Sequence, residues 1–257
     1  VEARGATETA YRALKAAGAV FRFGVQNGYC ASDPTRDLKG AIVLPVAQHR
    51  AAVTDPAKLG EMLRAIDTYQ GTPVVRAALA LAPLLFLRPG ELRKTEWPEV
   101  DLDGGLLTVP AARMKGRLKA KLSGPPHLVP LAPQAVAILR DLQPLTHRSK
   151  YVFPNPLTNE RPMSDNAVLS ALRRMGYEKT EASGHGFRAT ARTLLAERLG
   201  IDPQVIEAQL AHAVGDALGR AYNRTSYMDQ RRQMMVTWAT YLDTLRTGAK
   251  VLPFKAA

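Results

Sequence analysis

The sequence predicts a mainly α-helical protein with a small antiparallel β-sheet, which places it in the α+β class. Two observations lead to this prediction. Over most of the chain, apolar residues recur at three- and four-residue steps, the period of an amphipathic helix. Between Trp97 and Leu131 the pattern changes to short runs that are typical of strands, and the helical period then returns.

The first predicted helix runs from about Glu8 to Asn27 and ends at Gly28. The following stretch, 32–56, carries Asp-Pro, Lys-Gly and two further prolines between few periodic residues, so we interpret it as a linker. The first 45 or so residues are too few to bury a core of their own. We therefore expect residues 1–47 to be the C-terminal remnant of a helical domain with its linker, and 48–257 to form the main domain.

The main domain is expected to be rich in helices, and several of them have recognisable ends. Ser164 and Asp202 stand where N-caps belong, Pro203 occupies a first helical position, and Gly200 follows a helix end. The predicted helices span residues 56–69, 73–87, 133–143, 165–175, 186–199, 203–212 and 227–245.

Three short strands are predicted between these helices, at residues 100–102, 106–109 and 128–131. Asp103, Gly104 and Gly105 supply the turn between the first two strands. The second and third strands flank a loop without acidic residues, which holds the basic residues Arg113, Lys115, Arg117, Lys119 and Lys121.

The amino-acid composition limits the classes of function that this protein can have. The 257 residues carry 35 Lys and Arg against 23 acidic residues, a formal charge of +12, so a nucleic acid is the first partner to consider. A single cysteine, Cys30, excludes an internal disulfide framework and favours a reducing compartment. The best apolar stretch, 74–87, is interrupted by Arg76 and Pro83, so no bilayer span is predicted.

The sequence also predicts that neither a metal nor a cofactor takes part. Its histidines and its one cysteine do not have the spacing of zinc ligands, and no carboxylate trio suggests a two-metal nuclease. A phosphate-binding glycine loop is missing as well, which argues against nucleotide hydrolysis.

Four short motifs carry the chemistry that we expect. Arg88 lies in Leu-Arg-Pro-Gly-Glu-Leu, and His185 and Arg188 form a His-Gly-Phe-Arg motif on one helical face. His212 and Tyr222 follow in that order, ten residues apart. Each motif alone is weak, because such residues also serve as helix ends and surface groups.

Taken together and in this order, the motifs resemble the catalytic set of the tyrosine recombinases, or phage integrases. The resemblance is closest to integrases of satellite phages and genomic islands, and it covers essentially the whole chain. It is clearest at 82–92, at 185–190 and at 221–224. It implies a tyrosine recombinase catalytic domain at 48–257 and the end of a core-binding domain at 1–47, with an amino-terminal arm-binding domain missing here.

The resemblance implies that Tyr222 attacks a DNA phosphodiester. Arg88 and Arg188 would each offer a planar fork of donors to the phosphate. His185 would help to deprotonate Tyr222, and His212 would assist near neutral pH. The general acid would come from the hairpin between the second and third strands, where Lys115 stands.

Some of these assignments have rivals. The segment 116–124 is longer than in the family and adds Lys119 and Lys121. One of these lysines, rather than Lys115, can therefore be the general acid. Together with Arg113 and Arg117, these lysines are candidate DNA contacts. Tyr227 and Tyr241 compete with Tyr222, but Tyr241 falls on an apolar helical stripe. We expect Glu91 to anchor its turn and His127 to be structural.

The predicted function is site-specific recombination, the integration or excision of a mobile element through a 3′-phosphotyrosyl intermediate and strand exchange. Two alternatives remain: a relaxing topoisomerase, and a non-catalytic DNA-binding regulator with the same fold. The resemblance implies double-stranded attachment sites as partners, a tetramer on DNA and a monomer when free, with accessory DNA-bending proteins. It also implies a bacterial cytoplasmic, DNA-associated location without a membrane.

Overall fold

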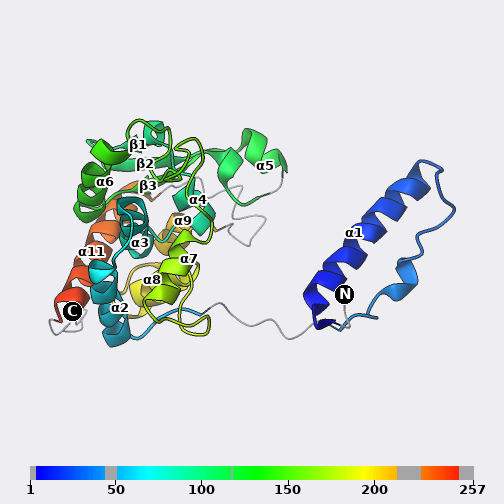
Figure 1. Cartoon of the computed structure of the whole chain (residues 1–257), viewed down its shortest axis with the longest axis horizontal. Coiled ribbons are helices and arrows are strands. Elements are labelled where there is room, and N and C mark those ends of the chain that lie inside the picture. Colours follow the sequence, from blue (N-terminus) through cyan, green and yellow to red (C-terminus); the bar gives the residue numbers. More distant parts are fainter. Residues whose placement is uncertain (1–3, 44–50, 117, 213–226, 249–257) are drawn as a thin grey trace. The chain divides into compact units, whose positions relative to one another are not determined.

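The computed structural model describes residues 4–43, 51–116, 118–212 and 227–248. The chain divides into two compact units, residues 1–49 and residues 50–257 (Figure 1). The domain boundary expected between residues 47 and 48 falls within 44–50, outside the described residues.

The first unit consists of a long helix and a chain segment that folds back on it. Helix α1 (Thr7–Gln26) is followed by the 3-10 turn η2 (Arg36–Leu38). Asp33 forms an ion pair with Arg22 of α1 at 3.1 Å. A Cβ at Gly18 would lie 2.6 Å from the Thr35 hydroxyl oxygen, so the close approach requires glycine there. The linker predicted from residue 32 onward is therefore wrong in its first part, which belongs to this unit.

The second unit is built around α3 (Pro73–Leu85), a helix that is apolar on nearly all sides. Leu79, Leu81 and Trp238 are fully buried. The Trp238 indole N–H donates to the carbonyl of Pro83 at 2.9 Å, which satisfies an acceptor near the end of α3. The surrounding helices that contact α3 are α2 (Pro56–Thr68), α4 (Pro89–Arg93), α6 (Pro133–Thr146), α7 (Ala167–Arg174), α8 (Gly186–Glu197) and α11 (Met228–Thr247).

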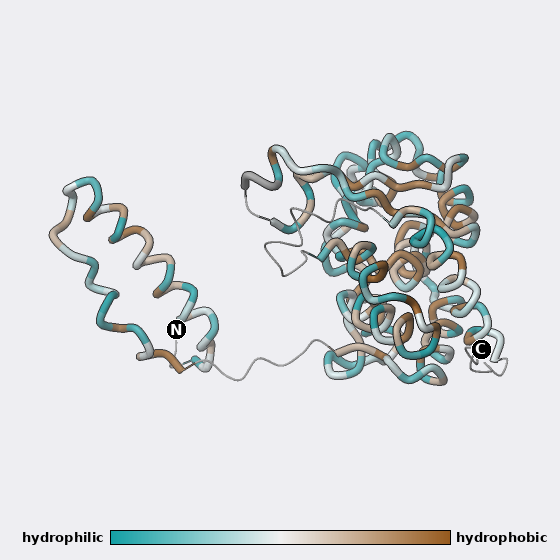
Figure 2. Tube along the Cα trace, turned by 180° about the vertical axis from the view of Figure 1, so that it is seen from behind, coloured by the Kyte–Doolittle hydropathy of each residue, from teal (hydrophilic) through white to brown (hydrophobic). Residues whose placement is uncertain are grey.

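The predicted antiparallel sheet is confirmed. Strands β1 (Val100–Asp101), β2 (Leu106–Val109) and β3 (His127–Pro130) pair in the order β1-β2-β3, with Leu107 opposite Val129. Their inward positions join the apolar core that Figure 2 shows in brown within this unit. The connection from β2 to β3 is more than a loop, because it contains the turn η4 (Ala111–Arg113) and the helix α5 (Leu118–Ser123). In both views α5 stands out from the body of the unit (Figures 1 and 2).

Helices α3 and α9 both end earlier than the sequence predicts. Helix α3 ends at Leu85 because Phe86 adopts the left-handed conformation, with φ 36°. Helix α9 (Pro203–Gln209) ends three residues before His212, and Ala211 is left-handed with φ 49°. Neither end carries the glycine that marks such a conformation in a sequence, which is why the period alone did not reveal them.

The predicted caps have mixed outcomes. The Asp202 side chain accepts from the Gln204 backbone N–H at 2.7 Å, and Pro203 is the first residue of α9, as predicted. The N-cap of α7 is Asn166, so the assignment to Ser164 was wrong; the Ser164 hydroxyl instead accepts from the Asn166 backbone N–H at 3.3 Å. Among the described helices, none is long and apolar enough to cross a membrane.

Candidate active site

Arg88 is positioned by the turn between α3 and α4. Pro89 begins α4, where its missing N–H costs no hydrogen bond. One Glu91 carboxylate oxygen accepts from the Arg88 backbone N–H at 3.1 Å, and the other accepts from the Arg88 guanidinium at 2.8 Å. The Glu91 side chain is buried and Arg88 is 18% exposed, so the carboxylate anchors the turn and aims the guanidinium, as the sequence suggested.

Arg188 lies on the first turn of α8 and is nearly buried, with 9% of its surface exposed. One terminal nitrogen donates to the carbonyl of Phe86 at 2.9 Å, and the other donates to the carbonyl of Leu210 at 2.7 Å. The left-handed turn at Phe86 frees that carbonyl from the helix, so the early end of α3 is what gives Arg188 its first partner. Arg188 thus joins the end of α3 to the end of α9.

The end of α9 presents three consecutive carbonyls that we call the carbonyl row, at Gln209, Leu210 and Ala211. A ring nitrogen of His127 lies 3.0 Å from the first, Arg188 donates to the second at 2.7 Å, and Arg88 donates to the third at 3.3 Å. Because the two arginines bind adjacent carbonyls, the row brings their guanidinium groups together. Three of the four left-handed non-glycine residues that the structure describes, Phe86, Ala211 and Tyr227, adjoin this site, a place where backbone strain tends to concentrate.

His212 follows the carbonyl row directly and is held on both sides of its ring. Nδ1 lies 2.5 Å from a carboxylate oxygen of Glu207, and Nε2 lies 3.1 Å from Arg188. The guanidinium can only donate, so Nε2 accepts and the Nδ1 proton points to Glu207. Arg192 binds the other oxygen of Glu207 at 3.0 Å. Glu207 and Arg192 were not singled out from the sequence; the one available signal was that Glu207 and His212 are five residues apart across a helix end.

The electrostatics of the cluster suit an anionic ligand. Burial and the nearby positive charge of Arg88 lower the pKa of Arg188 to about 10, which leaves it charged near neutral pH. Partial burial by itself acts to raise the pKa of Glu207, but the hydrogen bonds from His212 and Arg192 prevail and lower it. Two neighbouring cations repel each other, and a bound oxyanion would relieve that repulsion.

His185 lies beside the Arg88 turn. It is the N-cap of α8 and lines a pocket of about 300 Å³ together with Pro89 and Gly90. The next residue must be small, because a Cβ at Gly186 would lie 2.2 Å from the carbonyl oxygen of Ala51. The structure therefore joins three of the predicted residues, Arg88, Arg188 and His212, at the carbonyl row, and places His185 beside the turn that carries Arg88.

Lys115 is not joined to this cluster by any contact that the described residues make. It is exposed and lies in the turn between η4 and α5. Arg113 is engaged elsewhere, since its guanidinium binds Glu99 and the carbonyl of Lys94. Lys121 is half-buried on α5, Lys119 lies on the same helix, and Arg117 is outside the described residues.

Tyr222 also lies outside the described residues, within 213–226. Its rivals are described. Tyr241 is buried on α11 and packs against the Trp238 ring with centroids 5.9 Å apart, so its role is in the core. Tyr227 is half-buried and its hydroxyl donates to the side chain of Gln204 at 2.7 Å.

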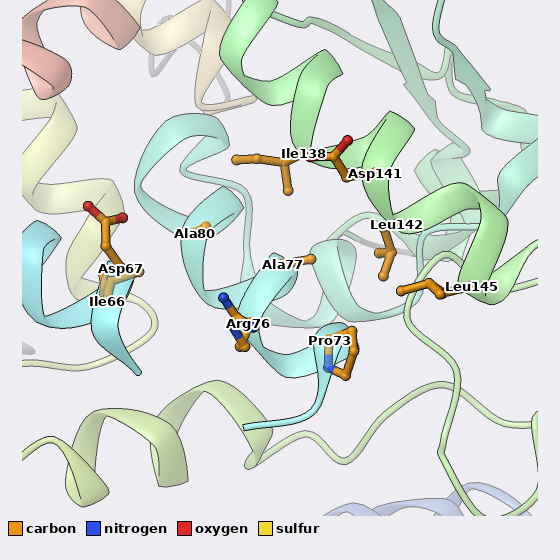
Figure 3. A pocket seen from close by; sticks show the side chains of 10 residues that line it. All are labelled: Ile66, Asp67, Pro73, Arg76, Ala77, Ala80, Ile138, Asp141, Leu142 and Leu145. Atoms are coloured by element: carbon orange, nitrogen blue, oxygen red, sulfur yellow. The ribbon is translucent and has the colours of Figure 1, made fainter. Parts of the chain in front are cut away.

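No group of three or more His, Cys, Asp or Glu that could hold a metal is found within the described part of the chain. A separate pocket of about 300 Å³ lies between α2, α3 and α6, where Ala77 and Ala80 are too small to fill the space opposite Ile138 and Leu142 (Figure 3). None of the predicted site residues lines it.

Fold and site together define a protein of the tyrosine recombinase class: a helical domain with a small sheet, in which two arginines and a histidine from separate motifs converge. Residues 53–228 match the model of the phage integrase family, and residues 1–41 match that of the phage integrase central domain. The chain belongs to the phage integrase family.

Its relatives agree with this. The chain is 38% identical to the integrase of Enterobacteria phage P4 over 96% of its own length and 57% of that protein. It is 34% identical to the putative protein IntB of Escherichia coli K12 over 100% of its length and 66% of that protein. The chain thus spans roughly 57–66% of these two relatives.

Solved structures share the fold. A lambda integrase dimer bound to a COC′ core site has a TM-score of 0.57 at 16% identity, covering 99% of this chain and 64% of that one. A lambda integrase tetramer bound to a Holliday junction has a TM-score of 0.54 at 18% identity, covering 79% and 58%.

Proposed function

We propose that this chain is the DNA-cleaving part of a site-specific recombinase that attacks a DNA phosphodiester with Tyr222. The observation that carries the proposal is the carbonyl row, which holds Arg88 and Arg188 side by side with His212 bonded to Arg188. Two adjacent guanidiniums suit the non-bridging oxygens of one phosphate, where charge develops in the transition state. The lambda integrase dimer, which is bound to a COC′ core site, supports the choice of DNA as the substrate.

In this mechanism the phenolic oxygen of Tyr222 forms a bond to phosphorus, and the bond from phosphorus to the 5′ oxygen breaks. His185 accepts the phenol proton and Lys115 protonates the departing 5′ oxygen. Arg88, Arg188 and His212 stabilise the charge on the phosphate. The product is a 3′-phosphotyrosyl adduct, which a 5′-hydroxyl of another strand attacks to complete the exchange without metal or cofactor.

Assembly and location follow from the same proposal. We propose that a tetramer holds two attachment sites, by analogy with the lambda integrase tetramer on a Holliday junction. Arg117, Lys119 and Lys121 are then candidates for phosphate contacts next to the cleavage site. Arg113 would join them only after giving up its ion pair with Glu99. The reaction would take place on bacterial DNA in the cytoplasm, with accessory DNA-bending proteins as further partners.

Covalent capture tests the proposal. The protein is incubated with randomly nicked duplexes of random sequence, denatured in detergent, and the DNA that stays attached is recovered and sequenced. A nick next to the cleavage site lets the short product diffuse away, which traps the adduct. We expect one sequence family to be enriched by the wild type and none by Tyr222→Phe, with equal DNA binding.

The same captured duplex separates the alternatives. Two differently labelled duplexes should yield exchanged products if the protein is a recombinase, whereas a relaxing topoisomerase would only reseal the original strand. DNA binding without any adduct would favour a non-catalytic regulator and would overturn the proposal.

A further inference from the structure

A buried arginine that the proposed chemistry does not use lies on the first turn of α11. Arg231 is only 4% exposed. Its Nε donates to the side-chain oxygen of Gln209 at 2.8 Å, and a terminal nitrogen donates to the carbonyl of Leu128 in β3. Gln209 itself is the first member of the carbonyl row. Arg231 therefore ties the start of α11 to the helix end that holds the two site arginines.

A second contact links the same two elements. Tyr227, the residue before α11, is left-handed with φ 49° and donates its hydroxyl proton to Gln204 at 2.7 Å. Gln204 and Gln209 both belong to α9. The start of α11 is thus fastened to α9 at two points, one at the surface and one buried.

The chain just before residues 213–226 is also held by α9. Glu207 of α9 binds His212, the last described residue before 213–226. Residues on both sides of the segment that contains Tyr222 are therefore held by side chains of α9. The Gln209 amide nitrogen is buried and has no hydrogen-bond partner among the described residues.

We propose that Gln204 and Gln209 are positioning residues, which hold Tyr227 and Arg231 and so fix where the segment with Tyr222 returns to the fold. This inference rests on the proposed function of Tyr222. Fixing both ends of a loop restricts the places that its central residues can reach. A displacement of about 1 Å at a reacting group can cost on the order of a hundredfold in rate, so even a surface hydrogen bond at the loop end can matter.

The test is a set of single-turnover rates of adduct formation on the captured duplex. Tyr227→Phe and Gln204→Ala each remove one side of the same hydrogen bond, so we expect each to slow the adduct by about tenfold. The double variant should be no slower than either single one, because both changes break one interaction. DNA affinity and the melting temperature should stay at the wild-type values.

Two controls separate positioning from general damage. Gln204→Glu keeps an oxygen acceptor for the Tyr227 hydroxyl and should restore the rate to within about twofold of the wild type. Gln134→Ala removes a glutamine bond to the far end of α11, at Asp243, and should leave the rate unchanged. Gln209→Ala should slow the adduct more than Gln204→Ala because its bond to Arg231 is buried. If Gln209→Ala does not fold, the rates of Tyr227→Phe and Gln204→Ala still test the positioning role.

Each outcome has one meaning. Wild-type protein that forms no adduct defeats the proposed function itself. Wild-type adduct with unchanged rates in Tyr227→Phe and Gln204→Ala overturns the positioning role alone, as do losses that multiply in the double variant. Complete loss in Tyr227→Phe with a normal rate in Gln204→Ala would make Tyr227 the nucleophile and would also overturn the inference.

Discussion

Acid should destabilise this protein through one buried side chain, His127. The imidazole is 8% exposed on β3, and burial together with the positive charge of Arg231 lowers its pKa from 6.5 to about 4. Arg88 and Arg188 act in the same direction. The folded state therefore keeps His127 neutral while the unfolded chain takes up a proton below pH 6.5. The stabilisation is complete above that pH and is lost as the pH falls toward 4.

The size of the effect follows from these two pKa values. Between pH 7.5 and pH 5, the linkage costs about 2 kcal/mol of unfolding free energy. His127→Gln can still donate to the carbonyl of Gln209 but does not titrate, so it should lose about 2 kcal/mol less than the wild type over the same range. Urea unfolding followed by circular dichroism at each pH measures the difference.

The matched control is His147→Gln, a change at an exposed histidine at the end of α6. It should keep the wild-type dependence on pH. Equal losses in the wild type and His127→Gln would refute the reasoning, because the buried imidazole would then contribute nothing to the acid sensitivity.

Three further predictions concern the site. Glu207→Gln removes the carboxylate that holds His212 and should slow adduct formation by about tenfold with unchanged DNA affinity; an unaltered single-turnover rate would contradict this. Ala211→Gly should raise the unfolding free energy by about 1 kcal/mol in urea titrations, because glycine adopts the left-handed conformation without strain, and a loss of stability would count against it. Lys115→Ala should lower the cleavage rate by on the order of a hundredfold or more, whereas the same effect from Lys119→Ala instead would move the acid onto α5.

The fold was largely predictable because the spacing of apolar residues along the chain indicates most of the helices and strands. Helix α11 and the pairing of β1 with β2 follow directly from apolar spacing and turn residues. The helix α5 was missed because its six residues, Leu118–Ser123, are too few to establish a helical period. The sequence did not reveal that the first part of the predicted linker is folded against α1. Its contacts there, such as the ion pair between Asp33 and Arg22, are polar tertiary contacts that leave no hydrophobic pattern.

The site was predictable as a set of residues but not as an arrangement. The motifs placed Arg88 and Arg188 on the turns where the structure has them. What joins them is a backbone feature, the left-handed residues Phe86 and Ala211, which release carbonyls for the guanidiniums. Nothing in a phenylalanine or an alanine signals that conformation, so only the coordinates reveal it. Glu207 was missed for a related reason, since its contact with His212 depends on the helix ending at Gln209.

The central claim is that the converging cations serve a phosphate attacked by Tyr222, and mass spectrometry of the captured adduct tests it most directly. Trypsin cleaves after Arg220, Arg224 and Arg231, so Tyr222 and Tyr227 fall into different peptides. After nuclease digestion, we predict a nucleotide remnant on the peptide 221–224. A remnant on the peptide 225–231, or on any other part of the chain, would contradict the account.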